Sequence, residues 1–259
     1  MKEKFQKLVN FNLIMGGFHF VQAMIMLFLA TNVIEKIVNF KPMIVQNYLR
    51  FDEISRTLVP ASRDLFELPF GLLVASFLLV SAFAHAIIVL NSNKYIEDLK
   101  KGINKFRWFE YAISSSIMIV LIATLFGVYD IATLILIFLV NATMNLFGLD
   151  MELLNSGSDK KNIKWGPFIW GSFAGIAPWI AILTYMFGTG NFSMVPWFVW
   201  AIIGTYFVAF NTFPINMILQ YKKIGKWQDY LYGERVYIIL SLAAKSILAW
   251  LVLFGAMQP

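Results

Sequence analysis

The sequence predicts an all-α membrane protein built as a bundle of seven transmembrane helices. The composition points to this class, because 59% of the 259 residues are hydrophobic and only 14% are charged. The apolar residues also gather in seven long runs, each close to the roughly 20 residues that cross a bilayer core as a helix. Only helices and closed barrels satisfy their backbone in lipid, and the alternating pattern of barrel strands is absent.

The seven expected helices follow one another along a chain that reads as one domain, residues 1–259. The first run follows Lys2, Lys4 and Lys7 and is too long for the apolar part of a signal peptide, so we interpret it as a helix. The connections between the later runs are short. The helices are expected at about 8–34, 68–91, 105–129, 131–153, 165–187, 194–221 and 231–257.

The one long connection, residues 35–67, is predicted to contain a small β-hairpin on the outer face of the membrane. Parts of it alternate between apolar and polar residues, beginning at Met43 and Val45, and such alternation is typical of a strand. A solvated linker is the alternative, but linkers are usually more polar. Packing against the helix ends or against a second subunit would account for the apolar residues.

The distribution of basic residues predicts the orientation of the bundle. Fifteen lysines and arginines, with Arg107 and Arg235 among them, lie in the N-terminal segment and in the second, fourth and sixth loops, against five in the first loop. Positive charge is retained in the cytoplasm, so the N-terminus is expected inside the cell membrane and the C-terminus outside. The net charge of +6 then reflects topology, and no nucleic-acid partner is expected.

Lys245 is the most informative residue, because it lies in the middle of the seventh apolar run. The nearest water boundary is roughly 14 Å away at the helical rise of about 1.5 Å per residue. A charge at this depth is costly and usually functional. A lysine paired only for structural reasons is the alternative.

Glu110 is the expected partner of Lys245, since an opposite charge lowers the cost of burying an ion. The other ionisable residues inside the apolar runs are His19 and His85, whereas Asp130, Asp150 and Glu152 are expected to reach water at helix ends. Two hydroxyls share faces with the pair. Ser241 lies four residues before Lys245, and Ser114 lies four residues after Glu110.

A buried lysine beside one carboxylate is suited to holding a carbonyl compound. The lysine amine forms a Schiff base, and a protonated Schiff base needs an anion beside it. A long apolar carbonyl ligand would also need an aromatic cleft between the helices. Candidates at the right depth are Tyr111, Met118, Met144, Trp179, Phe210 and Phe213. With seven helices and a lysine in the last of them, this set indicates retinal.

The chain resembles the heliorhodopsins almost from end to end. The residues that carry the resemblance are Asn10–Asn12, Phe18–His19, Phe106–Tyr111, Ser114–Ser116, Asn141–Met144, Ala174–Trp179, Gly225–Trp227, Gly233–Tyr237 and Ser241–Ser246. An N-terminus inside the cell, expected above from charge alone, is the hallmark of that family.

The resemblance implies a cofactor and roles for the residues around it. Lys245 would hold all-trans retinal covalently, Glu110 would be its counterion, and His19 and His85 would line a polar cavity near the Schiff base. Asn141, Met144, Trp179, Phe210 and Ser241 would border the chromophore. The resemblance also implies a homodimer, with the first loop near the subunit contact.

The sequence predicts a photoreceptor that does not pump ions. A pump needs titratable groups on both sides of the Schiff base, but Leu121 stands eleven residues after Glu110, Asp130 is the only acid towards the outer surface, and no buried arginine is expected. Either histidine could accept the Schiff-base proton, because imidazole titrates near neutral pH. The basic cytoplasmic loops would dock a signalling protein.

Two other classes of protein remain as alternatives. One is a light-gated ion channel or weak transporter on the same scaffold. The other is a retinal-free membrane protein, an enzyme or a regulator that uses the second and sixth loops, in which Lys245 and Glu110 form a structural bridge. An enzyme is not expected, because no buried nucleophile–base pair or glycine-rich phosphate loop is found. A metal site is not expected either, since the two histidines have no third ligand at suitable spacing and there are no cysteines.

Overall fold

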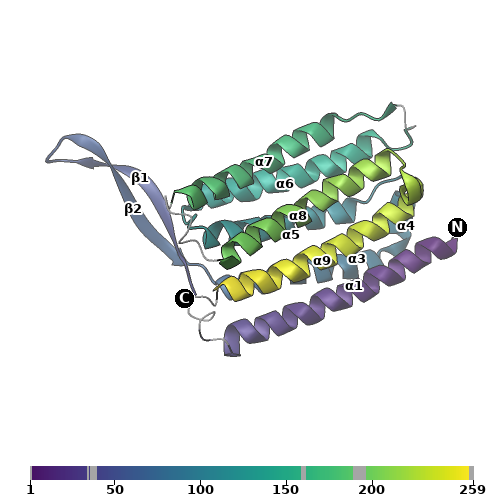
Figure 1. The fold of residues 1–259 in the computed structure, drawn as a ribbon, viewed down its shortest axis with the longest axis horizontal. Coiled ribbons are helices and arrows are strands. Elements are labelled where there is room, and N and C mark those ends of the chain that lie inside the picture. Colours follow the sequence, from purple (N-terminus) through teal and green to yellow (C-terminus); the bar gives the residue numbers. More distant parts are fainter. Residues whose placement is uncertain (1, 34, 36–39, 159–161, 189–196, 257–259) are drawn as a thin grey trace.

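The computed structural model describes residues 2–33, 35, 40–158, 162–188 and 197–256, and these contain seven helices of membrane-spanning length and composition (Figure 1). The predicted fold class is therefore confirmed. The membrane-length helices are α1 (Lys2–Phe28, continued by a π-helical turn, η1, at Leu29–Val33), α3 (Phe70–Leu90), α5 (Lys105–Leu125), α6 (Ile131–Leu154), α7 (Gly166–Phe187), α8 (Trp197–Tyr221) and α9 (Tyr230–Ala256).

Two helices differ in length from the sequence-based expectation. The first begins at Lys2 rather than near residue 8, because Phe5 and Leu8 pack into a small core with residues of α3 and α9. The third ends at Leu125 rather than near residue 129, because Gly127 takes a φ of 87°. Such a backbone conformation suits glycine and cannot continue a helix.

A short helix, α4 (Ser92–Lys100), was not predicted. It follows α3 at the end of the bundle where the N-terminus lies (Figure 1). Its sequence is too short and too polar to form an apolar run, but it buries Tyr95, Asp98 and Leu99. The helix therefore caps the end of the bundle.

The predicted hairpin in the first loop is confirmed. Strands β1 (Met43–Asp52) and β2 (Thr57–Glu67) are antiparallel, and their register runs from Met43 opposite Glu67 to Asp52 opposite Thr57. The hairpin projects beyond the end of the bundle at which α9 ends, opposite the end at which α1 begins (Figure 1). Its first strand is attached to the connection between α5 and α6, where the backbone N–H of Val45 donates to Tyr129 O at 3.0 Å.

The bundle buries apolar side chains in its interior and also exposes them on its outer surface. One continuous core contains residues of every spanning helix, among them Met26, Leu78 and Ile122. Large apolar side chains, for example Phe173 and Leu136, also point outwards. A surface of this kind is stable against lipid rather than water, so the chain is a multi-pass membrane protein.

Asp130 caps the start of α6 just outside the membrane span, and it gives a pH-dependent prediction. Its carboxylate accepts from the backbone N–H of Thr133 at 3.0 Å and from that of Asn47 at 3.2 Å. These bonds hold the pKa of Asp130 below its ordinary value. A lowered pKa means that the stabilisation is present at neutral pH and is lost as the pH falls through the folded-state pKa.

We expect Asp130→Ala to lower the free energy of unfolding by about 0.5–2 kcal/mol at neutral pH, as loss of a helix cap usually does. Asp130→Asn is the matched control, because asparagine still caps the helix but does not titrate. Thermal unfolding of the detergent-solubilised protein across the acidic range measures both effects. An alanine variant as stable as the wild type at neutral pH would contradict the prediction.

Candidate functional site

The amine of Lys245 lies in the interior of the bundle and forms an ion pair with Glu110. Lys245 comes from α9 and is 3% exposed, whereas Glu110 comes from α5 and is 9% exposed. The Nζ atom donates to Glu110 Oε1 in a short contact and to Ser241 Oγ at 3.0 Å. The structure thus brings together the lysine, the carboxylate and one of the two hydroxyls that the sequence analysis selected. Ser114, the other hydroxyl, is buried beside Glu110 on α5.

Ser81 on α3 completes the polar group around the amine, and sequence reasoning missed it. Lys245 Nζ donates to Ser81 Oγ at 2.7 Å, and Ser81 Oγ donates in turn to Glu110 Oε1 at 2.6 Å. A single serine in an apolar run carries little signal, because serines often bond back to their own helix. Its position four residues before His85 is the only hint that the sequence offers. The ion pair is thus fixed from three helices.

The two histidines lie next to each other, on α1 and α3. Their rings are stacked with centroids 5.5 Å apart, and His85 Nδ1 is 2.8 Å from Asn12 Oδ1. Both ring nitrogens of His19 are buried and have no hydrogen-bond partner among the described residues. Both rings also lie within electrostatic range of Lys245. The pair therefore places two buried imidazole rings near the amine.

Close packing of α1 on α3 beside His85 gives a test of this arrangement. A Cβ atom added at Gly16 would lie 2.8 Å from the Cβ of His85, whereas nothing lies within 4 Å of a Cβ added at the neighbouring Gly17. We expect Gly16→Ala to cost about 1–3 kcal/mol of stability, as overpacking does. We expect Gly17→Ala to stabilise the protein by roughly 0.5–1 kcal/mol, because alanine restricts the unfolded chain. Thermal unfolding of both variants measures the difference, and equal effects would contradict the packing argument.

A cavity of about 350 Å³ lies beside Lys245, among α5, α6, α7, α8 and α9. This volume is within the roughly 300–1,000 Å³ of small-molecule sites. The six wall residues expected from the sequence all line it: Tyr111, Met118, Met144, Trp179, Phe210 and Phe213. Tyr206 also lines the cavity, with its ring 5.0 Å from that of Trp179, and was not expected. Nothing in its sequence neighbours, Thr205 and Phe207, marks it as a residue of a cavity wall.

Asn141 does not line the cavity directly. Its amide donates to Ser115 Oγ at 2.8 Å and to Ser116 Oγ at 3.0 Å, so it connects α6 to α5. Ser115 is the lining residue at this place. Asn141 therefore acts on the cavity through the serine that it holds.

A comparison with known families identifies the family to which this chain belongs. The sequence model named Heliorhodopsin matches residues 8–257, nearly the whole chain. The chain belongs to the heliorhodopsin family. This family consists of retinal-binding rhodopsins, and its seven-helix bundle agrees with the fold described above. A search of curated proteins finds no match to the chain.

The residues of this heliorhodopsin fit retinal. The cavity is lined mostly by aromatic and aliphatic side chains, and the Lys245 amine is at its wall. Gly175 leaves room where a side chain would intrude, because a Cβ atom there would lie 2.7 Å from Met144 Sδ and 3.7 Å from Phe210 Cε1. A long apolar molecule with one carbonyl group matches a site with one amine. Lys245 would hold retinal, and the aromatic residues would enclose it.

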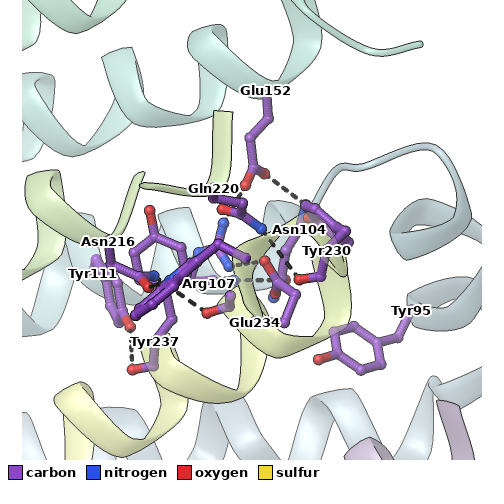
Figure 2. Close-up of polar contacts among 12 residues, drawn as sticks. Tyr95, Asn104, Arg107, Tyr111, Glu152, Asn216, Gln220, Tyr230, Glu234 and Tyr237 are labelled. Carbon is purple, nitrogen blue, oxygen red and sulfur yellow. Dashed lines mark hydrogen bonds and ion pairs between the residues drawn. The ribbon is translucent and has the colours of Figure 1, made fainter. Parts of the chain in front are cut away.

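A second buried ionic cluster lies at the end of the bundle that carries α4, and it corrects two expectations (Figure 2). Arg107 was counted with the exposed basic loop and no buried arginine was expected, but its side chain is 5% exposed. Glu152 was expected to reach water, but it is 2% exposed. Arg107 forms ion pairs with both Glu152 on α6 and Glu234 on α9. The sequence did contain a signal for this cluster: two acidic residues and one arginine stand near the ends of three helices that meet at the same end of the bundle.

Proposed function

We propose that this heliorhodopsin is a light sensor that binds all-trans retinal covalently at Lys245 and does not pump ions. The observation that carries the proposal is a buried amine at the wall of an aromatic cavity, paired with one carboxylate. Retinal, when bound as a protonated Schiff base, supplies absorption of visible light and isomerisation about a double bond. The protein supplies the charge balance and the path of the proton.

The polar groups around Lys245 have separate tasks in this proposal. Glu110 balances the positive charge on the lysine nitrogen, and Ser81 and Ser241 orient that nitrogen through their hydroxyl oxygens. Glu110, His19 and His85 are the proton-accepting groups nearby. A proton that leaves the nitrogen is therefore expected to stay inside the bundle, and the resulting shift of charge drives a slow change of conformation.

The distribution of buried ionisable residues supports a sensor rather than a pump. In the described part of the chain the buried acidic, basic and histidine residues lie at the Lys245 level or towards the end that carries α4: His19, His85, Asp98, Arg107, Glu110, Glu152, Glu234 and Lys245. Towards the hairpin, Thr124 is buried, but Asp130 is only partly buried, at the rim. A vectorial proton relay needs groups on both sides of the Schiff base. The hairpin side of this bundle lacks them in the residues described.

Illumination of lipid vesicles that contain the protein tests this part of the proposal. We expect a visible absorption change without a sustained change of pH across the membrane, and without a photocurrent. A light-driven pH change abolished by a protonophore would contradict the absence of pumping. A photocurrent that reverses with the applied voltage would instead support the light-gated channel.

We also propose the orientation and the assembly expected from the sequence. The basic N-terminal segment and the basic even-numbered loops support a cytoplasmic N-terminus in the cell membrane. Exposed apolar residues on the hairpin, among them Leu49, Phe51 and Leu58, support a homodimer that covers them. The basic loops remain the candidate docking surface for a cytoplasmic signalling protein.

A further inference from the structure

The cluster around Arg107 buries more negative than positive charge. Glu152 and Glu234 are 2% and 0% exposed, and each has Arg107 as its only ion-pair partner in the described chain. If both carboxyls are ionised, one guanidinium faces two carboxylates and a net charge of about −1 remains in the interior. A buried uncompensated charge is costly, and binding a proton removes the cost.

Asn104 donates hydrogen bonds to the carboxylate oxygens that Arg107 does not contact. Arg107 donates to the Oε1 atom of each glutamate in short contacts. The backbone N–H of Asn104 donates to Glu152 Oε2 at 2.7 Å, and its side-chain amide donates to Glu234 Oε2 at 2.8 Å. The amide orientation is fixed, because Asn104 Oδ1 accepts from the backbone N–H of Arg107 and caps α5. These donors are neutral, so they lower the energy of the extra charge without cancelling it.

Tyr230 is the first residue of α9 and lies close to this cluster. It lines a cavity of about 270 Å³ together with Lys100, Lys101, Lys223 and Gln220. Its hydroxyl group is buried, has no hydrogen-bond partner among the described residues, and interacts electrostatically with both glutamates. Figure 2 shows Tyr230 and Gln220 beside the cluster. A phenol hydroxyl can both donate and accept, so it can pass a proton.

We propose that Glu152 and Glu234 form a second proton-binding site, which exchanges one proton with the solvent at the basic end of the bundle through Tyr230. The proton adds to one Oε2 atom, displaces the hydrogen bond from Asn104 there, and leaves one carboxylate paired with one guanidinium. The other titratable groups that interact with the two carboxyls are Tyr95 on α4, Tyr221 on α8 and Tyr237 on α9, and they are neutral phenols at neutral pH. Arg107 remains the cation of the site.

This site is separate from the retinal site. Glu234 precedes Lys245 by eleven residues on α9, or roughly 16 Å along the helix at about 1.5 Å per residue. Side chains such as Trp108, Tyr111 and Tyr237 fill the space between, and the Tyr111 hydroxyl donates to the backbone oxygen of Tyr237 at 3.1 Å. Proton binding at the glutamates therefore does not depend on retinal, and the two proposals can fail independently.

Infrared spectroscopy of the full-length protein, purified with and without retinal, tests the site. A protonated carboxyl gives a C=O stretching band that an ionised carboxylate lacks, and exposed carboxyls are ionised at neutral pH. We expect such a band at neutral pH in both preparations. We expect it to be lost in Glu152→Gln and in Glu234→Gln, because one remaining carboxylate balances one guanidinium. Absence of the band from the wild type, or its survival in both variants, would overturn the proposal.

Two controls assign the band to this pair. Asp98→Asn removes another buried carboxyl at the same end of the bundle, and Glu97→Gln removes an exposed one. We expect the band to remain in both, and its loss in Asp98→Asn would overturn the assignment.

Tyr230→Phe tests the route of the proton. This variant keeps both glutamates, so it remains informative if the glutamine variants do not fold. We expect it to keep the band but to slow its shift when the protein is transferred to heavy water, and an unchanged rate would overturn the route through Tyr230.

Discussion

Lys245→Ala is expected to abolish the visible absorption band of the protein expressed with all-trans retinal. Lys245 is the amine that lines the aromatic cavity, so its loss removes the point of covalent attachment. The substitution also leaves Glu110 buried without its ion-pair partner. Breaking a buried pair from one side usually costs about 3–5 kcal/mol of stability. Absorption spectra and thermal unfolding, measured on the same samples, separate the two effects.

The double variant Lys245→Ala/Glu110→Gln is the matched control. It removes both charges, so we expect it to recover much of the lost stability while the visible band stays absent. A band that persists in Lys245→Ala would place the chromophore on another residue. No band in the wild type would instead favour the retinal-free alternative, in which the Lys245–Glu110 pair is a structural bridge.

The seven-helix fold was predictable because each spanning helix is long enough to cross a membrane and apolar enough to be recognised on its own. The pairing of Lys245 with Glu110 was predictable for a related reason. The membrane interior tolerates few charges, so one lysine and one carboxylate within the apolar runs had few alternatives. The hairpin was also predictable from the sequence, since its alternating apolar and polar residues lie in the one long connection.

The cluster around Arg107 was not predicted, because its burial depends on how three helix ends converge. Arg107 follows Lys100, Lys101 and Lys105 in the chain, and this neighbourhood suggests an exposed basic loop. Glu152 stands near the end of an apolar run, where a carboxylate normally reaches water. Only the packing of α5 against α6 and α9 places these side chains together and away from solvent. Ser81 was missed for the same reason, since its role comes from two other helices.

Arg107→Gln is expected to destabilise the protein more than any exposed substitution at the same end of the bundle. The arginine is the cation between two buried carboxyls, and its planar guanidinium contacts both at once. It also lies over the ring of Tyr237, with Cζ 3.9 Å from the ring centroid. Removing the positive charge leaves both glutamates without an ion-pair partner. We expect a loss of at least about 3–5 kcal/mol, the usual effect of breaking one buried pair.

Three further variants show whether charge or packing causes this loss. Arg107→Lys keeps the charge but not the two-pronged geometry, so an intermediate loss is expected. Adding Glu152→Gln and Glu234→Gln to Arg107→Gln removes all three ionisable side chains, so no buried charge is left unpaired, and this should restore much of the stability. Lys4→Ala breaks the exposed pair with Asp229 and should change little, because water screens that pair. If the neutral triple variant is no more stable than Arg107→Gln alone, the stabilisation comes from the shape of the arginine and its stacking on Tyr237 rather than from its charge.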